Sequence, residues 1–229
     1  IMKVLSFDVG IKNLAFCLLN ENDRFIEDWG ILNICTDPIC EHVSKTGKRC
    51  DKSVAFSSEG SFGTLCVCTA HKKLKCYSSH KFTKQKKGNN PMLSQGVCIV
   101  NTLSKKSNFL DVDKVVIENQ PALKNPTMKS IQMMIYSYFL IEGVCKTTSS
   151  IQTIEMINAR HKLKAYNGPA IQCDIKDKYK RTKFLGIEYC KHMIQSSEQQ
   201  DTWIHLFESS RKKDDLADAY LQGMYVLSL

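Results

Sequence analysis

The chain has 229 residues, 43% of them hydrophobic and 24% charged, with a formal net charge of +9. This length suits one α/β domain with an insertion, and its apolar stretches are shorter than the roughly 20 residues of a membrane-spanning helix. We therefore expect a soluble protein with no membrane partner, and the basic charge favours nucleic acid as the partner. We expect Ile1, ahead of Met2, to be a remnant of the expression vector, and the protein to be intracellular, since no signal segment follows.

Three short β-rich runs open the chain, over residues 3–9, 14–19 and 25–34. The turns between them are short and polar, and only antiparallel strands tolerate such short connections. The sequence therefore predicts an antiparallel meander at the start of the fold.

Residues 35–90 break this pattern. They show little periodicity, yet they hold six of the eleven cysteines, three of the six histidines and a run of lysines. Such a long loop with no structure of its own is uncommon in a compact domain, and cysteines in an intracellular chain favour metal ligation over disulfides. We predict that these residues form an inserted module whose structure is held together by a bound metal.

One set of ligands within this insertion has the spacing C-x9-C-x17-C-x2-H, and it consists of Cys40, Cys50, Cys68 and His71. A closed tetrahedral set of this kind holds structural zinc. Cys66 could replace Cys68, and a second site is also open to Cys35, His42, Cys76 and His80.

After the insertion, strands and helices alternate. We predict strands at 114–118 and 151–157, and helices at 91–107, 126–146, 176–194, 201–207 and 212–227. This order predicts an α/β fold in which helices pack on a mixed sheet. We accordingly expect one domain made of residues 2–34 and 91–229, interrupted by residues 35–90.

Four carboxylates stand where this fold could bring them together. Asp8 and Glu118 end apolar strands, and Asp215 and Asp218 lie three residues apart near the start of the last helix. A charged group buried at a strand end is costly unless it is paired or binds a cation, and carboxylate oxygens are the ligands that Mg²⁺ or Mn²⁺ prefers. Two such ions could activate a water and stabilise the leaving oxygen of a phosphodiester.

Three segments carry a family resemblance: Phe7–Ala15, Val116–Pro121 and Lys212–Ala219. They are similar, in this order, to the motifs of RuvC-type Holliday junction resolvases, above all those of poxviruses and related large DNA viruses. The resemblance implies an RNase H-like five-stranded mixed sheet and a homodimer that cuts four-way DNA junctions with two Mg²⁺ ions. It also implies a role in processing recombination or replication intermediates and, for a viral protein, a location in the host cytoplasm or the virion.

The resemblance implies that Asp8, Glu118, Asp215 and Asp218 are catalytic metal ligands, with Asp214 as a competitor for Asp215. It also implies a lysine near the active site, which we assign to Lys164, with Lys162 as the alternative. The basic residues expected to contact DNA are Lys12, Arg160, Lys162, Lys180, Arg181 and Lys183.

Other functions remain open at this point. Another RNase H-like nuclease, acting on flaps, RNA:DNA hybrids or transposon ends, would use the same acids. A non-catalytic zinc-dependent DNA-binding protein would use the basic residues alone. The sequence has neither glycine-rich nucleotide-binding motif, G-x-x-x-x-G-K-[ST] or G-x-G-x-x-G, so we expect no nucleotide cofactor.

Overall fold

The computed structural model describes residues 2–34, 39–60, 63–85, 91–197, 199 and 201–229. The chain divides into two compact units. We call Ile1–Cys35 together with Gly96–Leu229 the core unit, and Thr36–Gln95 the inserted module. Cys35, one of the alternative metal ligands, lies outside the described residues.

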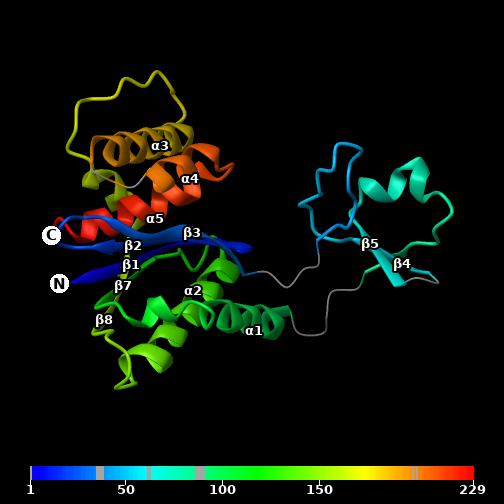
Figure 1. The fold of residues 1–229 in the computed structure, drawn as a ribbon, viewed down its shortest axis with the longest axis horizontal. Helices are drawn as coiled ribbons and strands as arrows, with labels where there is room; N and C mark the ends of the chain where they lie inside the picture. The colour runs from blue at the N-terminus through cyan, green and yellow to red at the C-terminus, as the bar shows by residue number, and fades with distance from the viewer. Residues whose placement is uncertain (1, 35–38, 61–62, 86–90, 198, 200) are drawn as a thin grey trace. The chain divides into compact units, whose positions relative to one another are not determined.

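A five-stranded sheet forms the centre of the core unit (Figure 1). Its strands lie in the order β3 (Ile26–Asn33), β2 (Asn13–Asn20), β1 (Lys3–Val9), β7 (Lys114–Glu118) and β8 (Thr153–Ile157). The first three strands are antiparallel, whereas β1, β7 and β8 run parallel to one another. The predicted mixed sheet with an antiparallel meander is therefore confirmed.

Helices cover both faces of this sheet (Figure 1). On one face lie α1 (Pro91–Leu103) and α2 (Pro126–Phe139), and on the other lie α3 (Lys178–Ser196), α4 (Asp201–Ser209) and α5 (Lys213–Val226). Side chains of a strand alternate between faces, so Leu5 and Phe7 of β1 pack in the cluster with α1 and α2. Ser6 and Asp8 therefore point to the face that α5 covers.

In two helices the regular α-helical part is shorter than the sequence predicts. The helix expected to reach residue 107 ends at Leu103, and a separate 3₁₀ turn, Ser107–Leu110, then buries Phe109. The helix expected to reach residue 146 continues beyond Phe139 as a π-helical turn, Leu140–Val144. This turn brings Gly143 so close to Ile151 that an added Cβ would lie 2.7 Å from the Ile151 Cδ1.

The inserted module contains a small antiparallel sheet in the order β5 (Gly63–Val67), β4 (Phe56–Gly60) and β6 (Thr83–Lys84). Two 3₁₀ turns, His71–Lys73 and Lys75–Tyr77, connect β5 to β6. The buried core of the module consists of Cys40, Val67 and Cys68, with a few partly buried residues around them. A core of this size is small for independent stability, which is why units of this kind commonly depend on a bound metal.

Among the helices that the structure describes, none is both long enough and apolar enough to cross a membrane.

Candidate active site

Asp8 and Glu118 come to adjacent positions at one edge of the sheet. Strand β1 pairs in parallel with β7, with Phe7 opposite Ile117, so the next residue on each strand is a carboxylate. A hydrogen bond joins the two carboxyl groups. The position of this pair follows from the pairing register, because Asp8 lies near the end of β1, Glu118 ends β7, and both point to the same face.

Helix α5 packs closely over this pair. Gly223 lies so near the sheet that an added Cβ would meet Leu19 Cδ1 at 2.7 Å and Ser6 Oγ at 3.0 Å. Gln222 donates from Nε2 to the Phe7 carbonyl at 3.2 Å, at the end of β1. This contact fixes the position of the helix along the sheet. Asp218, one turn before Gln222, therefore lies beside Asp8 and Glu118. The three carboxylates are close enough for their charges to interact: Asp218 acts on Asp8, and Glu118 acts on Asp218.

A lysine lies among these acids. Lys162, in the 3₁₀ helix Ala159–Ala165, is buried and forms an ion pair with Asp218. It also experiences the charges of Glu118 and Asp8. Lys164, two residues later, is exposed and does not line the pocket described below. Of the two candidate lysines, the structure therefore places Lys162 beside the carboxylates and Lys164 outside the pocket.

The electrostatics of this cluster reflect its burial. Burial raises the pKa of Asp8 well above its ordinary range, and the hydrogen bond with Glu118 raises it further. Burial also raises the pKa of Asp218 to about 6, although Lys162 acts to lower it. Burial acts to lower the pKa of Lys162, but the charges of Asp218, Glu118 and Asp8 outweigh it, so this pKa is raised. Burial and the neighbouring acids thus disfavour the charged forms of Asp8 and Asp218, and a bound cation would favour those charged forms.

Two further aspartates line the same pocket from the first turn of α5. Asp214 pairs with Lys183 at 2.5 Å, and Asp215 pairs with Lys212 at 2.8 Å. Burial acts to raise the pKa of Asp214, but the hydrogen bond from Lys183, the charge of Lys183 and backbone hydrogen bonds together outweigh it, so this pKa is lowered. The charge of Asp214 also acts on Asp218. Both aspartates thus lie at the site, each paired with a lysine.

A cavity of about 820 Å³ opens over the carboxylates. Four further basic side chains line it, namely Lys12, Arg160, Lys183 and Lys212. Lys180 and Arg181, which we also expected to contact DNA, are exposed near the start of α3 and do not line it. The cavity therefore combines a buried acidic floor with basic walls, an arrangement suited to a phosphate backbone over a metal site.

Polar contacts that the sequence did not predict hold the loops around this cavity. Gln132, fully buried in α2, accepts from the Gln120 backbone N at 2.9 Å and so fixes the loop that follows Glu118. Gly10 donates to the Asn13 carbonyl at 3.0 Å, and an added Cβ at Gly10 would lie 2.7 Å from that oxygen. A polar Gln132 within an apolar helix was a signal that could have been used.

The inserted module contains a separate cluster. The side-chain ligand atoms of Cys40, Cys50, Cys68 and His71 all lie within 4.8 Å of one another. His71 Nδ1 is 3.3 Å from Cys40 Sγ and 3.5 Å from Cys68 Sγ. The four predicted residues therefore converge as a set that could hold a metal ion. Cys66, which lies on β5, does not belong to this set.

No protein-family model matches the chain. The structure resembles the yeast mitochondrial Holliday junction resolvase Ydc2, with a TM-score of 0.52 and 15% identity, covering 99% of this chain and 79% of that one. Two weaker likenesses were also found. Thermus thermophilus RuvC has a TM-score of 0.48 and 8% identity, covering 98% of this chain and 92% of that one. The fowlpox virus resolvase has a TM-score of 0.45 and 15% identity, covering 99% of this chain and 97% of that one. The likeness to Ydc2 shows that the chain has an RNase H-like fold.

In sequence, the chain is 36% identical over 207 residues to an uncharacterized protein of Acanthamoeba polyphaga mimivirus, so it has a viral homologue. The match covers 83% of this chain and 49% of the mimivirus protein. The chain therefore spans about half the length of this curated relative.

Proposed function

We propose that the core unit is a divalent-metal-dependent endonuclease that resolves four-way DNA junctions. The observation that carries this proposal is the convergence of Asp8, Glu118 and Asp218, from β1, β7 and α5, on one buried site under a basic cavity. The resolvase fold supports the choice of substrate, since Ydc2 is named as a Holliday junction resolvase.

The donor set of this site fits Mg²⁺ or Mn²⁺. Its ligands are hard carboxylate oxygens, and the raised pKa values of Asp8 and Asp218 reflect acids crowded together in a buried place. Asp8, Glu118 and Asp218 would hold the metal, together with Asp215 or its neighbour Asp214. When bound, a pair of ions supplies an activated water and charge stabilisation for the leaving oxygen.

The chain's own residues bind and orient the DNA. Lys12, Arg160 and Lys183 line the cavity and contact backbone phosphates on either side of the acids. Lys162 lies closer, among the carboxylates themselves. Its ammonium group balances their charge, and once they hold a cation it is placed to donate to a phosphate oxygen at the scissile position.

A homodimer would supply two such sites for paired cuts across a symmetric junction. The surface that supports this part of the proposal is an apolar stripe at the end of α2. Met133, Leu140, Ile141 and Val144 are all exposed there, at helical spacing. Light scattering of the full chain tests it: we expect twice the monomer mass for the native chain and the monomer mass for Ile141→Asp.

The inserted module is proposed to hold one structural zinc ion. Three thiols and one imidazole would form a closed tetrahedral set, and zinc with a Zn–S bond of about 2.3 Å and a Zn–N bond of about 2.0 Å separates a sulfur ligand from a nitrogen ligand by about 3.5 Å. The distances from His71 Nδ1 to Cys40 Sγ and Cys68 Sγ, 3.3 and 3.5 Å, are close to that value. With no open coordination position, this ion would organise the module and take no part in cleavage.

Two alternatives use the same residues differently. Another RNase H-like nuclease, acting on flaps, RNA:DNA hybrids or transposon ends, would need the same carboxylates. A non-catalytic zinc-dependent DNA-binding protein would need none of them. The viral homologue supports a setting in which a large DNA virus processes its own replication or recombination intermediates.

A cleavage assay on matched substrates tests the proposal. The native chain with Mg²⁺ is compared on a four-way junction, a linear duplex of the same sequence, a flap and an RNA:DNA hybrid, with Asp8→Asn as the control. We expect paired symmetric nicks on the junction that Asp8→Asn abolishes. Cleavage mainly of another substrate would keep the nuclease and discard the resolvase.

A further inference from the structure

Most of the chain's net positive charge lies in the inserted module. Residues 36–95 contain eleven Lys and Arg against four Asp and Glu, whereas the remaining 169 residues contain twenty-one against nineteen. The proposed catalytic residues all belong to the core unit. Cleavage chemistry therefore gives no reason for this uneven distribution, and a separate function of the module has to explain it.

Much of this charge is carried by one stretch, His71–Lys84, which we call the basic segment. It contains five lysines and no acidic residue, namely Lys72, Lys73, Lys75, Lys81 and Lys84. All five are exposed, and none forms an ion pair with a residue in the described part of the chain. Unpaired lysines gathered on one short stretch suit a polyanion, because each neutralised phosphate releases a counterion.

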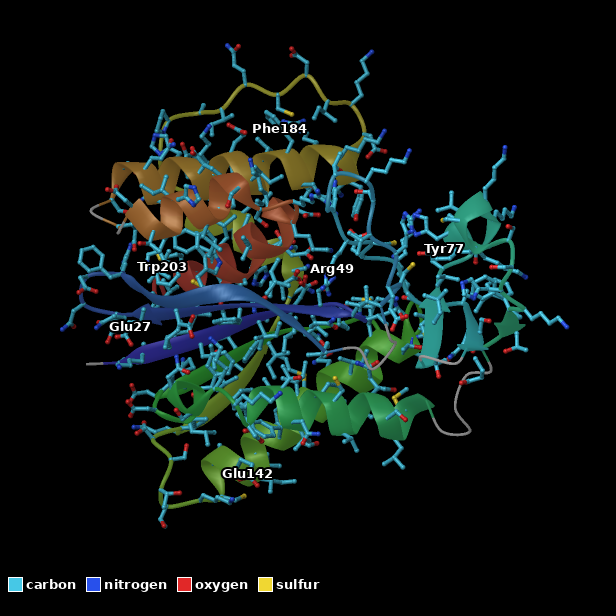
Figure 2. The ribbon with its side chains drawn as sticks, turned by 45° about the vertical axis from the view of Figure 1, so that its right-hand side comes forward. Glu27, Arg49, Tyr77, Glu142, Phe184 and Trp203 are labelled. Atoms are coloured by element: carbon cyan, nitrogen blue, oxygen red, sulfur yellow. The ribbon has the colours of Figure 1, made fainter. Side chains whose placement is uncertain are left out.

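Aromatic rings hold the basic segment in shape. Tyr77, labelled in Figure 2, lies at the centre of these contacts. Its ring contacts the rings of His80 and Phe82, with centroids 5.9 and 6.3 Å away, and its hydroxyl is 3.0 Å from His42 Nδ1. The His42 ring in turn contacts the His71 ring, with centroids 3.9 Å apart and the ring planes tilted by 37°. The lysines therefore project from a segment whose backbone is held by packed aromatic rings.

The metal cluster anchors this support. The basic segment begins at His71, one of the four clustered ligands, and the Lys72 backbone N donates to the Cys68 carbonyl at 3.1 Å. At its other end, β6 pairs with β4, with Lys84 opposite Phe56. Because the apolar core of the module is so small, the metal ligands determine where the lysines stand.

We propose that the basic segment is a second DNA-contacting surface, which binds backbone phosphates through its lysines and depends on the metal cluster for its shape. The proposal extends the proposed function, because it assigns DNA affinity to a unit that contains none of the catalytic residues. Two DNA-contacting surfaces on one chain raise the overall affinity without any new contact in the active site.

The test compares the salt dependence of DNA binding in two charge-matched variants of the full chain. Lys73→Gln/Lys75→Gln alters the basic segment, while Lys105→Gln/Lys124→Gln removes two exposed charges of the core unit outside the cavity. Fluorescence anisotropy with a labelled four-way junction, in Ca²⁺ to prevent cleavage, gives the affinity from 50 to 200 mM salt. Zinc content is measured in both variants to show that the module is intact.

We expect the affinity of the native chain to fall about ten-fold more over this range than that of Lys73→Gln/Lys75→Gln, because two phosphate contacts are missing in the variant. The core-unit variant should behave like the native chain. Equal salt dependence in all three proteins would overturn the proposal. A native chain that binds but cuts no substrate, with the predicted difference in salt dependence, would leave this inference standing and reject the proposed endonuclease.

Discussion

Lys162 and Lys164 lie two residues apart in one 3₁₀ helix, yet their surroundings are opposite. Lys162 is buried against Asp218, whereas Lys164 is exposed. The two positions therefore offer a matched pair of substitutions with the same change of charge. We expect Lys162→Gln to lower the rate of junction cleavage at saturating Mg²⁺ by about 100-fold, as is typical for one preorganised donor at a reacting group.

Lys164→Gln should change the same rate less than three-fold, because its side chain does not line the cavity. Single-turnover cleavage, with junction binding measured in parallel, separates a loss of chemistry from a loss of affinity. Equal losses of rate in the two variants would contradict the assignment of Lys162 to the active site.

The sequence was informative about the acids and not about this lysine. Asp8 and Glu118 stand out because a carboxylate at the end of an apolar strand costs free energy unless it is paired or binds a cation. Lys162 lies in a basic stretch where every second residue is Lys or Arg, and nothing in that pattern indicates which one turns inward. The 3₁₀ geometry of Ala159–Ala165 decides it, and that geometry depends on the packing of this helix on α5.

Helix α5 is the element that completes the site, since it brings Asp218 to a pair of residues far away in the sequence. Its close contact with the sheet depends on Gly223, where an added Cβ would lie 2.7 Å from Leu19 and 3.0 Å from Ser6. We expect Gly223→Ala to lower the free energy of unfolding by about 1–3 kcal/mol, the typical cost of overpacking a core. Denaturant unfolding measures this change.

Gly186 in α3 provides the control. An added Cβ there would lie 3.6 Å from Asp218 Oδ1, which is an ordinary contact distance. Gly186→Ala should therefore leave the stability unchanged or raise it by about 0.5–1 kcal/mol, because alanine favours a helix interior. If both variants lost the same stability, the close approach of α5 at Gly223 would not be the cause.

Prediction from the sequence was most accurate for the long elements of the core unit. Strands β1, β2 and β7 alternate or stay apolar over enough residues to be recognised. The π-helical turn after α2 could not be predicted, because its irregular backbone depends on the tight contact between Gly143 and Ile151. The short strands of the inserted module were also missed, since their polar sequences have no hydrophobic alternation.

At the scale of the whole molecule, the chain joins two units that are stabilised differently. The core unit has large apolar clusters on both faces of its sheet, whereas the inserted module has a few buried residues around its Cys/His cluster. We expect Cys68→Ser to lose the bound zinc and the structure of the module, while the core unit stays folded. Mass spectrometry gives the zinc content, and circular dichroism with limited proteolysis follows the two units.

Cys66→Ser is the matched control for this experiment, because Cys66 is a neighbouring half-buried thiol outside the cluster. It should retain one zinc ion per chain. If Cys66→Ser lost zinc and Cys68→Ser retained it, Cys66 and not Cys68 would be the ligand. If the native chain contained no zinc, the proposal that zinc holds the module together would be rejected.

The most direct test of the account measures junction cleavage and junction binding together in the native chain and in Glu118→Gln. This substitution keeps the size of the side chain next to Asp8 and removes its charge. We predict that, with Mg²⁺, the native chain cuts a four-way junction at symmetric positions and that Glu118→Gln binds the junction as tightly but cuts it at least 100-fold more slowly. Tight binding without cleavage by the native chain, unchanged in Glu118→Gln, would contradict the account and favour a non-catalytic DNA-binding protein.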